Sequence, residues 1–333
     1  MERRQPTLDE VAERAGVSRS AASRVINNAP HVSKAKRDAV RQAVHDLGYV
    51  PNPTARALAT RQVGAVVLAV SGDDPSLFAD PFVASVVVGV NAVLEETELD
   101  LMLVLATSTR GQSRLEQLLR SRQADGMMLM SLHGNDPLAD LAGQADFPVV
   151  FGGQPLNLEP DYYVDADNRG GARLAAEHLI ESGRKRIATI TGSLDEHAGV
   201  ARFRGFQEAM AMAGLSAHRV EQGNFTEDSG GKAMDRLLAG HPDLDAVFVA
   251  NDKMAVAALR VLREFGKSVP EDVAVVGFDD LAMAPHTVPP LTTVHQPIQA
   301  LGREMARMLL ALMAGEQPTP LILPTRLVIR DSS

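Results

Sequence analysis

The amino-acid sequence predicts two fold classes in one chain: an all-α helix-turn-helix headpiece over residues 1–50, and an α/β body with two doubly wound parallel sheets over residues 62–333. Three observations predict this division. Basic residues are concentrated at the N-terminal end, two successive helix patterns occur there, and the rest of the chain alternates apolar strand-length runs with helical patterns. With 333 residues, the chain is long enough for two or three compact units.

The composition excludes several classes of protein. The chain is 45% hydrophobic and 23% charged, which is typical of a globular protein with a large core. It contains no cysteine, so disulfides and thiolate zinc sites are excluded. We find no run of about 18 apolar residues that predicts a membrane span, and no apolar stretch after Met1 that predicts a secretory signal. These features predict a cytoplasmic protein without a membrane partner.

Charge is unevenly distributed along the chain. Residues 1–61 hold 11 of the 33 lysines and arginines but only 6 of the 42 acidic residues, a net charge of +5, whereas the remaining residues carry −14. A basic end on an acidic body favours a nucleic-acid contact confined to that end. A solvated basic surface is the alternative that charge alone leaves open.

The basic end contains two successive helix patterns. Thr7 and Glu10 have the spacing of a capping box before a short first helix. Gly16 suits the left-handed conformation that a tight turn requires. Ser18 then predicts the N-cap of a second helix over about residues 19–27.

The second helix divides into an apolar side and a polar side. The polar side covers an arc of about 140° at 100° per residue and consists of Arg19, Ser20, Ser23, Arg24 and Asn27. Arginine can bind guanine edges, and serine or asparagine can contact phosphates or bases. The spacing of caps, turn and helices favours DNA recognition over an amphipathic surface helix. A third helix is predicted over residues 34–47, capped by Ser33.

Residues 51–61 predict a short connecting helix. Asn52 can cap it and Pro53 suits its first position, but only about two turns can follow. In so short a segment, the few helical hydrogen bonds do not offset the free-energy cost of nucleating the helix. We therefore expect this helix to form only when a partner packs against it.

The body alternates strands and helices. Apolar runs of strand length occur at residues 63–71, 99–107, 126–132, 148–152, 187–192, 246–250 and 273–278. Helical patterns lie between most of them, for example at residues 80–96, 111–122, 168–182, 200–213, 252–265 and 298–314. Such a pattern predicts parallel sheets covered on both faces. Ligands of these sheets bind beyond the carboxyl ends of the strands, so two subdomains would hold a small molecule between those ends.

The usual enzyme signatures are missing from the sequence. No GxGxxG follows the first strand, no GxSxG or HExxH occurs, and the stretch GKS at residues 266–268 lacks the first glycine of a phosphate loop. The acidic pairs Asp165/Asp167 and Asp279/Asp280 are weak evidence for a metal. We therefore expect no catalytic residue, no cofactor and no metal.

Four motifs stand out in the first 52 residues: TLDEVA at 7–12, AGVS at 15–18, SRVIN at 23–27 and LGYVPN at 47–52. They resemble the headpiece of LacI/GalR-type bacterial repressors, and the resemblance extends almost to the C-terminus. In that family the second helix lies in the major groove of DNA. The resemblance implies base contacts from Arg19, Ser20 and Arg24, with the helix positioned on phosphates or bases by Ser18, Ser23 and Asn27.

The same resemblance assigns a partner to the connecting helix. Two such helices, one from each protomer, would lie side by side in the minor groove. Leu58 would enter the central base step and kink the duplex, while Ala55 permits close approach. The alternative is that Leu58 covers apolar surface on the body.

Several motifs of the body resemble the sensor body of the family, which is similar to periplasmic sugar-binding proteins. They are VAND at 249–252, VGFDD at 276–280, RFRGF at 202–206 and LTTVHQP at 291–297. This implies a small-molecule effector held by Phe82, Arg202, Phe225, Asn251 and Asp279. The alternatives are that Asn251 and Asp279 cap the segments that follow them and that Arg202 pairs with Asp279 or Asp195. The two phenylalanines could belong to the core.

The resemblance also implies how the body is divided. We expect an N-subdomain of about residues 62–162 and 291–323 and a C-subdomain of about residues 163–290 and 324–333. Three crossovers, near residues 162, 290 and 324, would join them. Because no leucine heptad follows Arg330, a homodimer is favoured over a tetramer.

Together these features predict a dimeric, ligand-responsive transcriptional regulator that binds double-stranded operator DNA. A repressor with a carbohydrate-like effector is the default, and the choice between inducer and corepressor stays open. A sugar-binding uptake protein would explain the body but not the basic end. A doubly wound enzyme would explain the alternation but not the missing phosphate loops.

Overall fold

The computed structural model describes residues 6–27, 31–50, 63–71, 80–106, 109–121, 123–134, 136, 138–139, 142, 145 and 147–333. The chain forms two compact units, residues 1–64 and residues 65–333, which we call the headpiece and the body. The connecting helix predicted over residues 51–61 lies outside the described residues, together with Asn52, Ala55 and Leu58.

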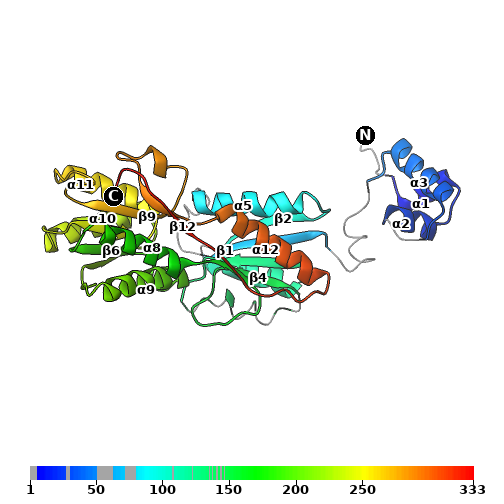
Figure 1. Ribbon diagram of the computed structural model, residues 1–333. Helices are drawn as coiled ribbons and strands as arrows, with labels where there is room; N and C mark the ends of the chain where they lie inside the picture. The colour runs from blue at the N-terminus through cyan, green and yellow to red at the C-terminus, as the bar shows by residue number, and fades with distance from the viewer. Residues whose placement is uncertain are drawn as a thin grey trace. The chain divides into compact units, whose positions relative to one another are not determined.

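The headpiece has the three predicted helices: α1 (Leu8–Ala15), α2 (Arg19–Ile26) and α3 (Lys34–Leu47) (Figure 1). The capping box is present, because the Glu10 amide donates to the Thr7 hydroxyl at 3.3 Å and the Thr7 amide donates to the Glu10 carboxylate at 2.7 Å. Gly16 is left-handed at φ 64°, and the Ser18 hydroxyl accepts from the Ala21 amide at 3.2 Å.

One prediction for the headpiece needs correction. Ser33 stands at the N-cap of α3, but its side chain makes no cap hydrogen bond. The three helices are held by a small apolar core whose buried members are Val11, Ala12, Ala22, Val25, Val40 and Ala43. The apolar side of α2 is therefore the side that packs, as its sequence pattern predicts.

Two six-stranded sheets form the body (Figure 1). The first has the order β11-β5-β4-β3-β1-β2 and is parallel throughout: β1 (Ala65–Ser71), β2 (Asp100–Ala106), β3 (Gly126–Met130), β4 (Val149–Gly152), β5 (Tyr163–Ala166) and β11 (Leu321–Leu323). Its central strand β1 is buried along its whole length, with Leu68 paired to Leu103 on one side and to Met128 on the other. A strand covered on both faces requires this continuous apolar run.

The second sheet has the order β12-β10-β9-β8-β6-β7: β6 (Ile187–Thr191), β7 (Val220–Gln222), β8 (Ala246–Val249), β9 (Ala274–Asp279), β10 (Thr292–His295) and β12 (Arg326–Val328). It is parallel except that β12 runs antiparallel to β10. We call the first sheet with its helices the N-subdomain and the second sheet with its helices the C-subdomain.

Helices cover both sheets. The N-subdomain contains α5 (Pro81–Leu94), α6 (Thr109–Ser121) and α12 (Ile298–Met313), and the C-subdomain contains α8 (Asn168–Glu181), α9 (His197–Met212), α10 (Glu227–Gly240) and α11 (Asp252–Glu264). Glycines allow α5 and α12 to approach closely, since a Cβ at Gly302 would lie 2.2 Å from the Val86 carbonyl oxygen. Among the described helices, none combines the length and apolar character needed to cross a membrane.

Two of the three crossovers lie a few residues beyond their predicted positions. β5 begins at Tyr163, which pairs with Phe151 of β4, so this strand still belongs to the first sheet. β10 pairs with β9 through Thr293 and Gly277, so it belongs to the second. The crossovers therefore follow residues 166 and 295 instead of 162 and 290, because a strand pattern shows that a strand exists but not which neighbour it pairs with. The third crossover, between β11 and β12, agrees with the predicted residue 324.

Candidate functional site

A cavity of about 370 Å³ lies in the body between the two subdomains. Its lining includes residues that end or follow strands of both sheets: Ser71, Met130, Gly152 and Asp165 in the N-subdomain sheet, and Ser193, Asn224, Asn251, Asp279 and Gln296 in the C-subdomain sheet. It therefore lies where doubly wound sheets predict a ligand site. Its volume is within the range of about 300–1,000 Å³ that small-molecule sites occupy.

Arg202 is the centre of a buried polar network in this cavity. Its Nη1 lies 3.2 Å from Oδ1 of Asp279 and donates to the Ala250 carbonyl at 2.5 Å, while its Nε donates to Oδ1 of Asn168 at 2.8 Å. The guanidinium carbon lies 3.7 Å from the centroid of the Phe278 ring. The ion pair with Asp279, which the sequence leaves as an alternative, is therefore present, and both partners also line the cavity.

Burial sets the pKa values of this pair. Burial raises the pKa of Asp279 to about 6, with Arg202 opposing the shift, and burial lowers the pKa of Arg202, with Asp279 opposing it. Both shifts express the cost of removing two charges from water. The Gln296 amide donates to the same Oδ1 of Asp279 at 2.8 Å. The network presents a planar donor beside a hydrogen-bonded carboxylate, which is an arrangement suited to neighbouring hydroxyl groups.

Asn251 and Phe225 form one side of the cavity. Asn251 caps α11 by accepting from the Met254 amide at 3.0 Å, and its Nδ2 donates to the Phe225 carbonyl at 3.0 Å. Asn251 is thus the cap that one interpretation predicts and also a lining residue. Phe225 is left-handed at φ 65°, and its half-buried ring stands over Gly192, where a Cβ would lie 2.0 Å from the ring. This ring belongs to the cavity wall.

Phe82 reaches the cavity from the N-subdomain. It occupies the first turn of α5, where its amide donates to the capping carboxylate of Asp80 at 2.9 Å. Asp80 also forms an ion pair with Lys253 on α11 of the C-subdomain. The structure thus brings all five predicted effector residues to one cavity, and Asp80 and Lys253 join the subdomains across it.

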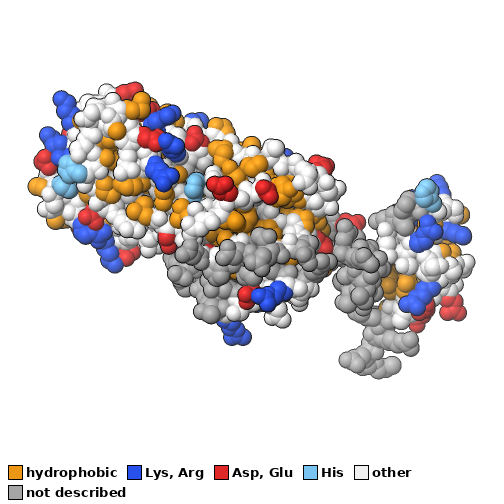
Figure 2. Space-filling model, turned by 90° about the horizontal axis from the view of Figure 1, so that it is seen from below, with side chains coloured by type: hydrophobic (Ala, Val, Ile, Leu, Met, Phe, Trp, Pro, Cys, Tyr) orange, Lys and Arg blue, Asp and Glu red, His pale blue; other side chains and the backbone are white. Residues whose placement is uncertain are grey.

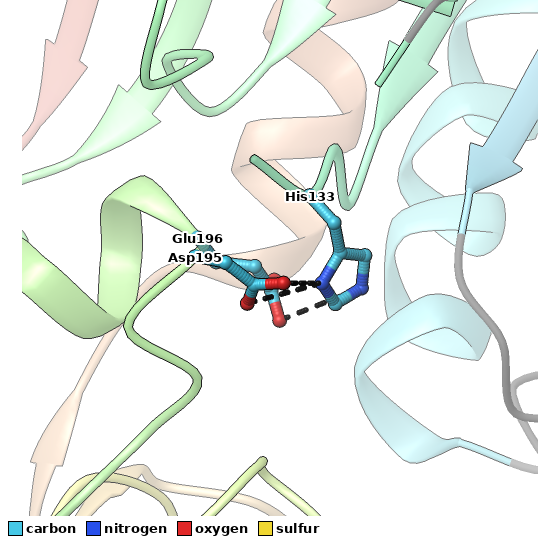
Figure 3. A group of neighbouring side chains, drawn as sticks. All are labelled: His133, Asp195 and Glu196. Carbon is cyan, nitrogen blue, oxygen red and sulfur yellow. Dashed lines mark hydrogen bonds and ion pairs between the residues drawn. The ribbon is translucent and has the colours of Figure 1, made fainter. Parts of the chain in front are cut away.

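A histidine and two carboxylates form a second polar cluster in the lining: His133, which follows β3, and Asp195 and Glu196, which precede α9 (Figure 3). One donor atom of each lies within 4.8 Å of the others. The ring presents Nδ1 to Asp195 at 3.3 Å and Nε2 to Glu196 at 3.7 Å. Because the two carboxylates face different ring nitrogens, the three side chains contact one another and do not surround a single position, so we assign no metal to them.

Several residues of the cavity were not among those predicted. Gln296 follows β10, so its position after a short strand was the signal that could have found it. Asn168 follows β5, and the sequence leaves a helix cap or a ligand contact as its alternatives; Asp167 is the residue that caps α8, and Asn168 lies in the lining. His133, Asp195 and Glu196 lie in loops without a pattern. Behind the cavity, Asp252 is fully buried and accepts from the Leu281 amide at 2.7 Å.

On the headpiece, α2 divides as its sequence predicts. Its apolar members Ala22 and Val25 are buried. The polar side comprises exposed Ser18, Arg19, Ser20 and Arg24 and half-buried Ser23 and Asn27. All lysines and arginines of the described headpiece residues are exposed, which gives this unit its basic surface (Figure 2).

Comparisons with known proteins identify both units. Residues 7–52 match the model of the lacI family of bacterial regulatory proteins, and residues 176–333 match the model of a periplasmic binding protein-like domain. A curated relative, the HTH-type transcriptional regulator CelR of Thermobifida fusca, is 48% identical over 336 residues, with 99% of each chain covered.

Two solved structures resemble the chain over nearly its whole length. A transcriptional regulator CelR–cellobiose complex shares 46% identity with a TM-score of 0.79, covering 99% of this chain and 100% of the other. The lac repressor dimer bound to operator and the anti-inducer ONPF shares 29% identity with a TM-score of 0.86, covering 99% of both chains. The predicted fold is confirmed, and the uptake-protein alternative is not retained. The chain belongs to the LacI family of bacterial regulatory proteins, and it is a DNA-binding transcriptional regulator.

Proposed function

We propose that this protein is a cytoplasmic, dimeric repressor whose operator affinity is changed by an uncharged oligosaccharide of glucose, with cellobiose as the first compound to test. The observation that carries the proposal is that one cavity is lined by the paired polar side chains of Arg202 and Asp279 and by the aromatic rings of Phe82 and Phe225. The CelR relative that shares 46% identity was solved with cellobiose, which supports the same ligand class. Membership of a DNA-binding family supports regulation and not catalysis as the role of the cavity.

Charge favours a neutral ligand. Among the residues that the structure describes, five carboxylates line the cavity: Asp80, Asp165, Asp195, Glu196 and Asp279. Its lysine and its arginine are each paired with one of them, Lys253 with Asp80 and Arg202 with Asp279. An anionic sugar would have to compete with these pairs and would meet the other carboxylates. Sugar hydroxyls can instead donate to carboxylates and accept from the guanidinium.

The two phenylalanines favour a ring with apolar faces. Phe225 and Phe82 reach the cavity from different subdomains. Pyranose rings expose apolar C–H groups on their faces, so aromatic walls and polar ends together match a carbohydrate. A purine ring also has apolar faces, so it is the ligand class against which a carbohydrate must be tested.

We further propose that the exposed side of α2 reads the operator, with Arg19, Ser20 and Arg24 contacting bases and Ser18, Ser23 and Asn27 positioning the helix. The exposure of the first three supports this role. Asn52, Ala55 and Leu58 would form the minor-groove contact between two protomers. A ligand can shift operator affinity only if it binds the two subdomain arrangements with different affinity.

A ligand panel tests the proposal. Thermal unfolding is followed with cellobiose, glucose, gluconate and hypoxanthine, because a ligand that binds only the folded state stabilises it by about 2.7 kcal/mol at one hundred times its dissociation constant. Cellobiose should raise the unfolding temperature, and Phe225→Ala should remove that rise. Phe265→Ala, at a phenylalanine that is 55% exposed outside the cavity, is the matched control and should keep it. A response to gluconate or hypoxanthine alone would contradict the proposal.

A further inference from the structure

Two sets of side chains connect the subdomains across the cavity. Lys253 is paired with Asp80, and His133 of the N-subdomain faces Asp195 and Glu196 of the C-subdomain (Figure 3). Because the partners come from different subdomains, these contacts exist only while the subdomains are this close. We call the second set the His133 cluster.

The His133 cluster is held on both sides of the imidazole ring. Its Nδ1 lies 3.3 Å from both carboxylate oxygens of Asp195, and its Nε2 lies 3.7 Å from Oε1 of Glu196. The neighbouring Gly134 amide donates to the Asp195 carbonyl at 2.6 Å, which adds a backbone contact between the same two loops. These side chains bind one another across the cavity. Their effect is therefore to hold the N-subdomain and the C-subdomain together at this side of the cavity.

The two carboxylates of the cluster have unlike environments. Burial raises the pKa of Glu196 to about 7, with His133 opposing the shift and Asp195 adding to it. For Asp195, partial burial is outweighed by hydrogen bonds from Ser193 and His133, so its pKa is lowered. Glu196 is therefore the carboxylate that can bind a proton near neutral pH while Asp195 stays ionised.

Arg202 and His197 lie near Glu196, and each faces a carboxylate outside the His133 cluster. Arg202 acts on Glu196 at longer range but is paired with Asp279. His197, the next residue after Glu196, faces Asp165 at 3.5 Å. When Glu196 carries a proton, the His133 cluster holds one negative charge fewer, which removes the cost of burying that carboxylate in its charged form.

We propose that the His133 cluster is a proton-dependent latch across the effector cavity, which closes the cavity and tightens effector binding as the pH falls from 8 to 6. The effector part of this statement rests on the function proposed above. The latch itself concerns the subdomains and can be tested without effector.

The direction follows from linkage. If opening the cavity exposes Glu196 to water, its pKa returns from about 7 toward the ordinary 4.5, so the closed state holds its proton more firmly than the open state. Between pH 4.5 and pH 7, closure of the cavity is therefore accompanied by binding of a proton to Glu196. Above pH 7 Glu196 is ionised in both states, so protonation no longer favours the closed state. One such group makes closure up to about tenfold more favourable at pH 6 than at pH 8. Asp279 also has a pKa of about 6, so the experiment must separate the two groups.

Spin labels measure closure directly, and the chain contains no cysteine that would interfere. Gln117→Cys on α6 and Met212→Cys on α9 place one label on each subdomain at exposed positions. Labelled subunits are diluted with unlabelled ones, EDTA is present to remove trace metals, and interlabel distances are measured by electron–electron double resonance without ligand. The distance distribution should shift toward shorter values from pH 8 to pH 6. An unchanged distribution would overturn the proposal.

Variants assign the effect to the cluster. Glu196→Gln mimics the protonated carboxylate and should keep the short distance at both pH values, whereas His133→Ala should favour the long distance at both. Glu208→Gln, at a carboxylate of α9 that is paired with Arg169 and does not line the cavity, should behave as the unaltered protein. A pH shift that persists in Glu196→Gln would assign it to Asp279 or another group and contradict the proposal.

Cellobiose affinity, measured by calorimetry at pH 6 and pH 8, tests the coupling. We expect binding up to about tenfold tighter at pH 6, with little difference in Glu196→Gln. If cellobiose binds equally at both pH values, the coupling is overturned. If it does not bind at either pH while the label distances shift, the latch is supported and the proposed effector is wrong, so the two failures are distinct.

Discussion

Arg202 and Asp279 face each other at 3.2 Å in the cavity between the subdomains, and each leaves only 6% of its side chain exposed. Arg202 comes from α9 and Asp279 from the end of β9. Neither charge can be removed without leaving the other buried and unpaired, so this pair serves the stability of the C-subdomain as well as the proposed site.

The first prediction concerns Asp279. Asp279→Ala should abolish the response to effector and should lower the free energy of unfolding by about 3–5 kcal/mol, because Arg202 loses its buried partner. Operator affinity without effector should persist, since the headpiece is a separate unit. Ligand titration and urea unfolding of the same preparation check both effects. Asp279→Asn, which keeps the shape, is the comparison, and normal ligand binding by the alanine variant would remove Asp279 from the site.

The second prediction concerns Asp252. Burial raises its pKa well above the ordinary value, with Asp279 adding to the shift and a hydrogen bond from Thr293 opposing it. The folded protein therefore binds this proton more firmly than the unfolded chain, so the stability it contributes is lost as pH rises through the folded-state pKa.

Asp252→Asn removes that titration. Between pH 5 and pH 8, the free energy of unfolding of this variant should then fall less steeply with pH than that of the unaltered chain. The two slopes should differ by at most about 1.4 kcal/mol per pH unit. Urea unfolding of the body at several pH values measures the slope, and Asp235→Asn at an exposed position of α10 provides the reference. Identical slopes for Asp252→Asn and the unaltered chain would show that Asp252 stays ionised in the folded state.

The third prediction concerns recognition by α2. Arg24→Ala should weaken specific operator binding by about 1–3 kcal/mol and change non-specific binding much less, because a base contact discriminates between sequences. Lys36→Ala, at an exposed lysine in the first turn of α3, should weaken both alike if it contacts phosphates. Binding to operator and to unrelated duplex at one salt concentration separates the two. Equal losses for Arg24→Ala would mean that Arg24 contacts only backbone.

The fourth prediction concerns Leu58, which lies outside the described residues. If Leu58 enters a base step, Leu58→Ala should reduce operator bending and affinity, because an inserted side chain kinks DNA by about 20–90°. Effector binding should be intact. The bend angle is measured from the gel mobility of circularly permuted operator fragments. An unchanged bend angle would refute the insertion of Leu58 into a base step and favour the alternative that Leu58 covers apolar surface on the body.

Local patterns in the sequence predict local structure well. The capping box of Thr7 and Glu10, the left-handed Gly16 and the apolar run of β1 each depend on neighbours in the chain, and each is present. Asn251 and Asp279 could be placed at one site because the carboxyl ends of parallel strands meet at one edge of a sheet.

Contacts between distant segments could not be predicted in the same way. The sheet membership of β5 and β10 depends on pairing with strands elsewhere in the chain. The ion pair between Asp80 and Lys253 joins residues 173 positions apart. These contacts depend on how close the two subdomains lie, and that distance is set by tertiary packing, not by any short sequence pattern.

The most direct test of the account is the operator affinity measured by fluorescence anisotropy with and without saturating cellobiose, together with the cellobiose affinity measured with and without saturating operator. Coupling between two sites is reciprocal, so both affinities should change by the same factor, about fivefold or more. An operator affinity that is identical with and without bound cellobiose would contradict the claim that the cavity controls DNA binding.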